Sequence, residues 1–568
     1  MHCGCVQSAE DIEALVVDED MPELERFAKL LERGRVVQRL SVMLNLPTLV
    51  ADNGADACKP LLSLLVDLTP SIVRAAGHPD GSGLAVAVAQ ALGALLSAAE
   101  PLPVSILEGL LLPIAIKALE IAPLTPIDEN ATGAEWLHFL LLLLRTRRLP
   151  PATLERTVLP WALEHGSVSA PRQHRLLCTH VLGAIAEANP HPRWIEKHFL
   201  GPALAMCQDT ELVVRCSMCE QLHRIAAAVG PELAGGAPLT ELLELATDEH
   251  PEVRAAAFEC GVAMLPTCSA SRRNDFLEPA VRRTVGVCIH LLEGSADAAT
   301  ERLVLRVSSN LSALLEALSR CGHFAPPLLD DSGPGGISVY ERLVVCLSMS
   351  QAVELRRACA RALPAAAAAL ATSDETAIRL HACARALRDD DERDVRTELL
   401  AALPLVASSI GTRLASTHTL PLVLWALERA EPFSLVTLLS HLPDLIATLS
   451  AGVSDHARLT LGQQLLPLLL QLEAPLAESW RGTHAIIRSF GALTDCLEPQ
   501  TLFSLVLPTL FQHLVAESAA PNRLEAVTVI CMHVRVPWRA RIFPTSPRQR
   551  DAPPPPLVHL RARAVAHA

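Results

Sequence analysis

Two cysteines at CxxC spacing are the most obvious candidates for chemistry in this sequence. Cys216 and Cys219 have the spacing of one half of a tetrahedral zinc site, which needs four thiolate or imidazole ligands. No second pair lies near them in the sequence, and both fall in a stretch with the apolar period of a helix. We therefore expect these cysteines to pack in a core, and we predict neither a metal nor a cofactor.

A glycine pair precedes one apolar stretch, where a dinucleotide-binding loop would place its glycines. Gly81 and Gly83 match the first two positions of that motif, but Val86 occupies the third and no strand pattern comes before them. The sequence also contains no phosphate-binding loop with its lysine and no HExxH among its 21 histidines. We predict that the chain is not an enzyme and has no catalytic residue.

An aspartate followed five and six positions later by Val-Arg recurs along the sequence. Full copies cover residues 209–215, 248–254 and 390–396, and residues 350–356 form a weaker copy. We favour a structural interpretation, in which each aspartate caps the following helix and pairs with an arginine of its own or a neighbouring repeat. The alternative is that the stacked turns present polar groups to a partner. The candidate partner-binding residues are then Asp209, Arg215, Asp248, Arg254, Asp390 and Arg396.

Prolines beside apolar runs recur with a similar period. They are Pro113, Pro160, Pro202, Pro238 and Pro279, with spacings of 47, 42, 36 and 41 residues, and then Pro421, Pro467 and Pro508, with spacings of 46 and 41. Because the first turn of a helix tolerates proline, each of them predicts a helix that starts at or just before it. A helix, a turn with Asp and Val-Arg, and a second helix then form a unit of about 40 residues.

That period is typical of HEAT and armadillo repeats. The composition agrees, because half of the 568 residues are hydrophobic and only 3% are aromatic, with Leu and Ala as strong helix formers. We predict an all-α protein, a HEAT/armadillo-type α-solenoid of about twelve stacked antiparallel helix pairs. One solenoid replaces the roughly four domains that the length alone would suggest.

The composition changes at both ends of the chain. We expect residues 1–25 to form an acidic N-terminal segment, since eight carboxylates and no basic residue occur between Glu10 and Glu25. Residues 26–534 are expected to form the solenoid, with a loop interruption near 326–337. Residues 535–568 are rich in Arg and Pro and are predicted to be a disordered tail.

The charge excludes one class of partner and the apolar pattern excludes a membrane span. The part of the chain up to Val534 has 41 basic and 61 acidic side chains, a net charge of −20 that would repel nucleic acid. The longest uncharged stretch, Gly81–Ala99, contains polar residues and lacks basic anchors, so no span is predicted. With no signal-peptide pattern, we expect the sixteen cysteines to be reduced, buried thiols.

Two segments resemble the protein phosphatase 4 regulatory subunit 4 family. Residues 9–50 resemble its N-terminal region, and residues 206–265 are similar to two of its consecutive HEAT repeats. Weaker similarity continues through residues 438–452 and 480–487, whereas residues 75–150 are less similar. The most diagnostic positions are Asp209, Val214, Arg215, Met218, Cys219, Gln221 and Leu222. The family's array continues beyond the point, near Val536, where this chain turns into the Arg/Pro tail.

The resemblance implies a non-catalytic, cytoplasmic regulatory or scaffold subunit. Its partner would be the catalytic subunit of a type-2A-like serine/threonine phosphatase, phosphatase 4, whose activity on phosphoprotein substrates it would regulate or target. The metal ions and the hydrolysis would then belong to the partner. The alternative left open is another HEAT-repeat adaptor, such as an importin-like transport receptor, with which an acidic surface is compatible.

Overall fold

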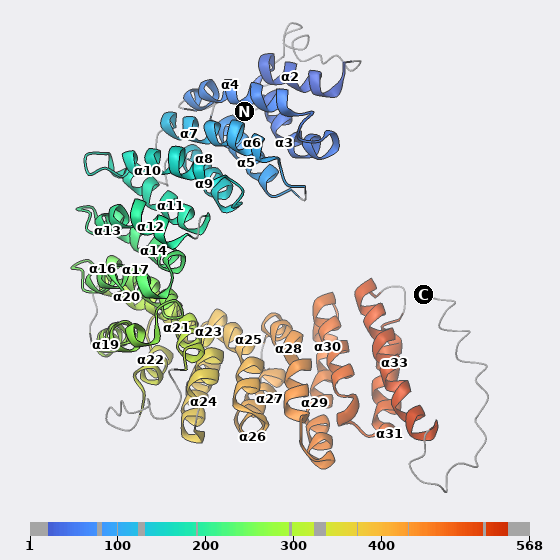
Figure 1. Ribbon diagram of the computed structural model, residues 1–568. Coiled ribbons are helices and arrows are strands. Elements are labelled where there is room, and N and C mark those ends of the chain that lie inside the picture. The colour runs from blue at the N-terminus through green and yellow to red at the C-terminus, as the bar shows by residue number, and fades with distance from the viewer. Residues whose placement is uncertain are drawn as a thin grey trace, which may run out of the picture. The chain divides into compact units, whose positions relative to one another are not determined.

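The computed structural model describes most of the chain, and every regular element in the described part is helical (Figure 1). The described residues are 21–76, 82–98, 100–122, 131–188, 191–294, 298–322, 337–371, 373–429, 431–514 and 518–542. The chain divides into two compact units. The first comprises residues 1–291 and 296–307, and the second comprises residues 292–295 and 308–568.

The helices up to Ser309 follow one another at short intervals, and five-residue π-helical turns, labelled η, interrupt several of them. These elements are α2 (Glu23–Arg33), α3 (Val36–Asn53), α4 (Lys59–Ala75), α5 (Ser82–Leu96), α6 (Val104–Ile106), η1 (Leu107–Leu111), α7 (Leu112–Ile121), α8 (Ala131–Arg145), α9 (Pro151–Thr153), η2 (Leu154–Val158), α10 (Leu159–His165), α11 (Arg172–Ala188), α12 (Pro192–Ile195), η3 (Glu196–Leu200), α13 (Gly201–Cys207), α14 (Leu212–Val229), α15 (Pro231–Ala234), α16 (Ala237–Leu245), α17 (Pro251–Met264), α18 (Ala270–Arg272), η4 (Arg273–Leu277), α19 (Glu278–Glu293) and α20 (Ala298–Ser309).

The remaining helices continue the same alternation, with η6 a short 3-10 turn. These elements are α21 (Leu311–Arg320), α22 (Val339–Ser348), α23 (Val353–Leu370), α24 (Asp374–Arg388), α25 (Arg393–Ile410), α26 (Thr412–Leu414), η5 (Ala415–Thr419), α27 (Leu420–Arg429), α28 (Pro432–Ser450), α29 (Asp455–Leu476), α30 (Trp480–Ala492), η6 (Thr494–Cys496), α31 (Pro499–Thr501), η7 (Leu502–Val506), α32 (Leu507–Gln512) and α33 (Ala520–Ile542).

Each unit contains a row of stacked helices, which we call the second-row helices. In the first unit α3, α5, α8, α11, α14 and α17 contact one another in that order, and in the second unit α21, α23, α25, α28, α30 and α33 do so. Figure 1 shows α25, α28 and α30 side by side, with α27 and α29 beside them. These twelve second-row helices, counted in the described part of the chain, match the number of hairpins expected from the period. The predicted all-α class and the stacking of helix pairs into a solenoid are confirmed.

Small aliphatic side chains fill the core between the stacked helices. In α14, Val214, Met218, Leu222 and Ile225 are fully buried, and their spacing of three and four residues keeps them on one face. Burying each such side chain stabilises the fold by roughly 1.5–3 kcal/mol. Close contact also needs small residues, since a Cβ added at Gly183 of α11 would lie 2.4 Å from a side-chain oxygen of α14.

Seven of the eight recurring prolines lie inside helical stretches, and this corrects the expectation that a helix begins at each of them. Six of them follow a π turn by two residues; in the first case the Leu112 N–H donates to the Leu107 carbonyl, and Pro113 comes next. The helical stretch has by then already run from Val104. A wider turn moves the preceding carbonyls away from the proline ring, which would clash with them in a regular α-helix. Pro238 does lie in the first turn of α16, whereas Pro467 lies within α29.

The segment boundaries differ from the sequence prediction at both ends. Helix α2 begins at Glu23, within the acidic segment 1–25 and before the expected start of the solenoid at residue 26, and α33 continues to Ile542, eight residues beyond its expected end. Helix α33 thus continues past Pro537, although the Arg- and Pro-rich composition predicted a disordered tail there. The expected loop near 326–337 lies almost wholly outside the described residues, as do residues 1–20 and 543–568.

No helix that the structure describes combines the length and the apolar character that a membrane crossing needs.

Candidate functional site

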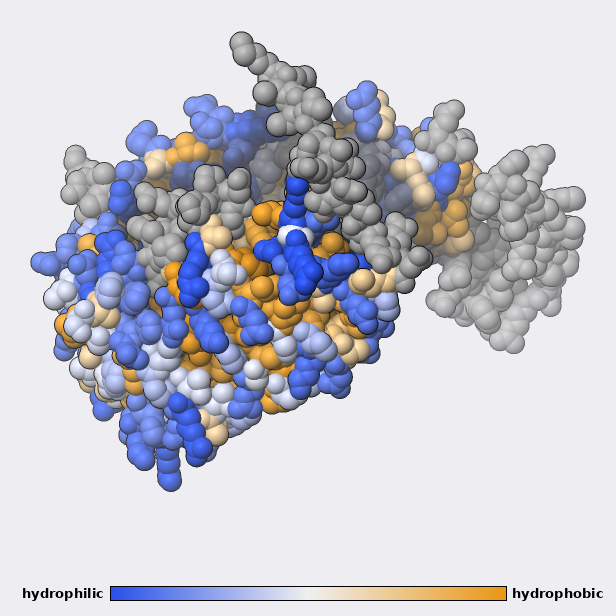
Figure 2. Space-filling view, turned by 90° about the horizontal axis from the view of Figure 1, so that it is seen from above, coloured by the Kyte–Doolittle hydropathy of each residue, from blue (hydrophilic) through white to orange (hydrophobic). Residues whose placement is uncertain are grey.

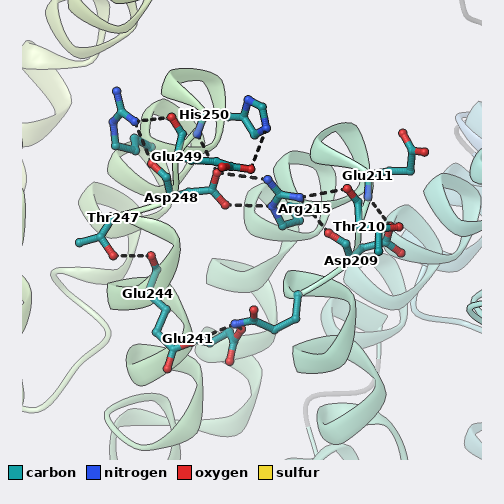
Figure 3. Close-up of polar contacts among 12 residues, drawn as sticks. Asp209, Thr210, Glu211, Arg215, Glu241, Glu244, Thr247, Asp248, Glu249 and His250 are labelled. Carbon is teal, nitrogen blue, oxygen red and sulfur yellow. Dashed lines mark hydrogen bonds and ion pairs between the residues drawn. The ribbon is translucent and has the colours of Figure 1, made fainter.

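The turns between paired helices hold the residues that the sequence singled out, and each turn is closed by its own arginine (Figure 3). The Arg215 Nη1 group donates to the Asp209 carbonyl oxygen at 2.9 Å. In the next repeat the Arg254 Nη1 group donates to the carbonyl oxygens of Asp248 at 2.8 Å and Glu249 at 3.0 Å. The arginine lies six residues after the aspartate because one helical turn brings its side chain back over the loop.

The other side of each guanidinium reaches the following repeat. Arg215 donates through Nε to Asp248 Oδ2 at 2.9 Å and through Nη2 to Asp248 Oδ1 at 3.1 Å. Arg175 forms the same bidentate pair with Asp209 at 2.8 and 3.0 Å, and Arg356 forms it with Asp390 at 2.6 and 3.0 Å. We call these three pairs the turn ladder. They join successive repeats through side chains that are at most 17% exposed.

Two aspartates of the ladder, Asp248 and Asp390, are held as carboxylates. Burial raises the pKa of Asp248, but the Arg215 guanidinium and the His250 backbone N–H outweigh burial, so its pKa lies below the usual range. The pKa of Asp390 is lowered in the same way, since Arg356 and the Glu392 backbone N–H outweigh burial. Such bidentate, charge-assisted pairs are stronger than neutral hydrogen bonds.

The structure assigns each predicted residue a definite place. Asp209, Arg215, Asp248 and Asp390 belong to the turn ladder, whereas Arg254 and Arg396 close their own turns through backbone carbonyls. The expected capping of the second helices by these aspartates is wrong. The side chain of each aspartate instead accepts a hydrogen bond from the backbone N–H two residues later. In α14, for example, the N-cap residue is Glu211, and its N–H donates to Asp209 Oδ1 at 2.9 Å.

Three members of this arrangement were not among the candidate residues, and one of them, Arg356, lies in the weaker copy of the motif at 350–356. Arg175 was missed because its segment, SAPRQHR, keeps the final arginine of the motif but has Ser169 and His174 in place of the aspartate and the valine. Glu431 pairs with Arg396 at 3.2 Å but belongs to a repeat without the motif. The weaker copy at 350–356, which also starts with serine, was the available pattern that could have revealed Arg175.

The side chains that project from the turns to solvent are the neighbours of the ladder residues. Glu211, Glu249, Asp391 and Glu392 are exposed, and the side chain of Glu249 is 83% exposed. An acidic edge therefore accompanies the turns in both units. The turn ladder holds the backbone of this acidic edge in place, and the exposed carboxylates remain accessible to a partner.

A second set of charges links the second-row helices of the first unit. Glu187 of α11 lies 3.2 Å from both Arg145 of α8 and Arg224 of α14. Arg306 of α20 lies 2.6 Å from Glu259 of α17 and 3.6 Å from Glu220 of α14. These side chains are about one third exposed and alternate in sign, so they form a polar surface that spans several repeats.

Hydrophobic side chains also reach the surface between the charged ones (Figure 2). On α33, Leu524, Val527 and Met532 are 71%, 44% and 50% exposed, while Ala526 and Val529 on the opposite face are buried. A helix with two apolar faces is typical of an array whose members pack on both sides.

The two cysteines at CxxC spacing are withdrawn from solvent, Cys219 fully and Cys216 in part. Burial raises the pKa of Cys216 to about 11, and the pKa of Cys219 lies well above its usual value because of its hydrogen bond to Cys260 and its burial. Among the described residues no group of three or more His, Cys, Asp or Glu side chains is arranged to hold a metal ion.

Comparison with known proteins places these features in a family context. No protein-family model matches the chain. It is 25% identical to the human serine/threonine-protein phosphatase 4 regulatory subunit 4 over 555 residues, which cover 93% of this chain and 59% of that protein. The mouse protein of the same name is also 25% identical, over 552 residues. The chain thus spans 59% of the length of these curated relatives.

Solved structures are similar in fold. A crystal structure of importin beta has a TM-score of 0.53 and 13% sequence identity, covering 92% of this chain and 74% of that one. A Kap95:Nup1 complex has a TM-score of 0.50 at 12% identity, covering 90% of this chain and 68% of that one. By fold the chain is therefore a HEAT-type helical solenoid, and by sequence it resembles phosphatase 4 regulatory subunit 4 over nearly its whole length, as the motifs at 9–50 and 206–265 predicted.

Proposed function

We propose that this chain is a non-catalytic regulatory or scaffold subunit that binds the catalytic subunit of serine/threonine protein phosphatase 4. It regulates that enzyme or targets it to phosphoprotein substrates, and it works in the cytoplasm. The metal ions and the hydrolytic chemistry belong to the catalytic subunit. The observation that supports this proposal is the 25% identity over 93% of the chain to proteins named as phosphatase 4 regulatory subunits.

The architecture suits such a role. A stack of hairpins offers long surfaces on its turn edge and its second-row helices, which fit a folded protein better than a small substrate. We propose that the partner contacts the acidic turn edge through exposed residues such as Glu211 and Glu249. Asp209, Arg215, Asp248, Arg254, Asp390 and Arg396 contribute to binding by holding the turns in position.

Affinity purification of the tagged full-length chain from cell lysate tests the partner. We expect the phosphatase 4 catalytic subunit to be recovered in near-stoichiometric amount, with phosphatase activity that a type-2A inhibitor abolishes. Recovery of Ran or transport cargo without any phosphatase catalytic subunit would overturn the proposal in favour of an importin-like receptor. The similarity to importin beta concerns the fold alone, and no further observation favours that alternative.

A pair of variants tests the contact surface. Glu211→Lys combined with Glu249→Lys should reduce recovery of the catalytic subunit at least about tenfold, because charge reversal at a rim weakens association. Thermal unfolding should be unchanged, since both side chains are exposed. Glu155→Lys, on η2 and away from these turns, is the matched control and should bind normally. Equal recovery with all three proteins would exclude the turn edge as the contact.

A further inference from the structure

Four arginines lie together near the C-terminal ends of α8 and α11, in the first unit. Glu187 of α11 lies 3.2 Å from the Nε atom of Arg145 on α8 and 3.2 Å from the Nε atom of Arg224 on α14. Arg147 and Arg148 follow in the turn after α8, and a span of two residues covers at most about 7 Å, so both lie close to Arg145. We call these four arginines and Glu187 the arginine corner.

The arginine corner has more positive charge than its carboxylate can balance. Residues 145–154 include three arginines and no acid, and the four arginines and one glutamate of the corner leave a net charge of +3. Arg147 is exposed and Arg148 is half-buried, and neither forms an ion pair with any residue that the structure describes. The corner is therefore a positive site on a chain that up to Val534 has a net charge of −20.

The surroundings of the arginine corner do not cancel this charge. Glu220, one turn before Arg224 on α14, already lies 3.6 Å from Arg306. Burial lowers the pKa of the neighbouring His180, and the charges of Arg224 and Arg145 lower it further. A positive potential thus remains where α8, α11 and α14 adjoin.

Arg147 occupies a backbone position that suits glycine better than arginine. Its φ of 56° makes it the one non-glycine residue with a positive φ in the described part of the chain. It follows the end of α8, where its N–H donates to the Leu144 carbonyl oxygen at 3.1 Å. A residue with this conformation at a helix end is usually glycine, because a Cβ is strained there. Folding alone would favour glycine, which indicates a use for the arginine side chain.

The donors of the arginine corner suit a phosphate group. Arg145 donates to Glu187 through Nε, and its two Nη groups donate to no residue that the structure describes. Guanidinium groups bind phosphate oxygens through parallel N–H donors, and a phosphoserine or phosphothreonine carries a charge of about −1.5 to −2. One such group matches the local excess of charge. A nucleic acid fits less well, because its run of phosphates would meet the net −20 of the surrounding chain.

We propose that the arginine corner binds the phosphate group of a phosphorylated serine or threonine in a protein partner. The proposal rests on the function proposed above, since phosphoproteins are the substrates to which that subunit directs its enzyme. The bound phosphate anchors the phosphoprotein on the solenoid, and the hydrolysis takes place at the catalytic subunit. Arg147 and Arg148 supply the charge that no described carboxylate neutralises.

Fluorescence anisotropy with the purified full-length chain, free of phosphatase, tests the proposal. The probe is a short labelled peptide with one phosphoserine among neutral residues, and its unphosphorylated form is the reference. We expect the phosphorylated peptide to bind about tenfold more tightly at low salt, because only the phosphate forms charge-assisted hydrogen bonds with the corner. Equal binding of the two peptides would overturn the proposal. Since no phosphatase is present, that result would leave the recovery of the catalytic subunit from lysate as a separate question.

Arg147→Gly separates binding from folding. The melting temperature should stay the same or rise, because glycine tolerates the positive φ, whereas the phosphopeptide should bind at least about threefold more weakly. Arg148→Gln should weaken binding by a similar factor. Arg172→Gln is the matched control and should bind normally, because this exposed arginine begins α11 at the end opposite Glu187.

Two further outcomes would overturn the proposal. One is unaltered phosphopeptide binding when Arg147→Gly and Arg148→Gln are combined. The other is tighter binding of a labelled single-stranded oligothymidylate than of the phosphopeptide at the same salt concentration, which would assign the corner to nucleic acid.

Discussion

The Arg215 guanidinium and the Asp248 carboxylate form a bidentate ion pair that joins two successive turns of the first unit, at 2.9 and 3.1 Å. The same arginine also donates to the carbonyl oxygen that closes its own turn. One side chain thus fixes a turn and couples it to the next repeat, with 11% of its surface exposed. This double use explains why an arginine recurs at this position, since lysine lacks the planar fork.

Arg215→Gln should lower the free energy of unfolding by about 2–4 kcal/mol, since it leaves the buried Asp248 carboxylate without its partner. Urea unfolding of the full-length chain measures this change. Glu249→Gln, whose side chain is 83% exposed, should change stability by less than about 0.5 kcal/mol. In a double-mutant cycle with Asp248→Asn, a coupling of about 1–3 kcal/mol is expected, and a coupling near zero would contradict the ladder.

Stability should decrease as the pH falls below about 6.5, the ordinary pKa of histidine. Burial, followed by the charges of Arg224 and Arg145, lowers the pKa of His180 in the folded chain. As the pH falls, His180 therefore takes up a proton in the unfolded chain before it does so in the folded chain. Unfolding becomes more favourable until the pH reaches the lower pKa that His180 has in the folded chain. His180→Gln should reduce the slope of unfolding free energy against pH between 5 and 7. An unchanged slope would show that this histidine titrates normally.

The buried thiols should be inert to alkylation at pH 8. Burial raises the pKa of Cys178 and of Cys288 to about 12, so almost no thiolate forms there. Iodoacetamide labelling followed by peptide mass spectrometry should modify the exposed Cys531 and leave these two unmodified until urea is added. Rapid native labelling of Cys178 would indicate that α11 opens locally.

Two glycines should respond oppositely to the same substitution. A Cβ at Gly462 of α29 would lie 1.9 Å from the Cys496 carbonyl oxygen, so the backbone must shift, and Gly462→Ala should destabilise by about 1–3 kcal/mol or more. A Cβ at Gly286 of α19 would meet nothing within 4 Å, and Gly286→Ala should stabilise by about 0.5–1 kcal/mol. Thermal unfolding distinguishes the two. Equal effects would mean that α29 and η6 do not pack as described.

The sequence by itself determined the class of fold and the recurring unit. A period near 40 residues, with Leu and Ala dominant, is enough to predict stacked helix pairs, because each hairpin must bury apolar faces against its neighbours. The Asp and Val-Arg motif likewise located the turns correctly. Its valines, Val214, Val253 and Val395, are fully buried, as a residue at the start of a core helix should be.

Only the tertiary structure decided which side chains pair. Sequence spacing could not show that Arg175 binds Asp209, because the two are 34 residues apart and Arg175 stands in a degenerate copy of the motif. Sequence spacing also could not show where the prolines lie in their helices. Proline is most often found in the first turn of a helix, but a π turn allows the helix to continue through Pro113. Local periodicity fixes which residues are buried in one hairpin. The stacking of one repeat on the next fixes which carboxylate an arginine meets.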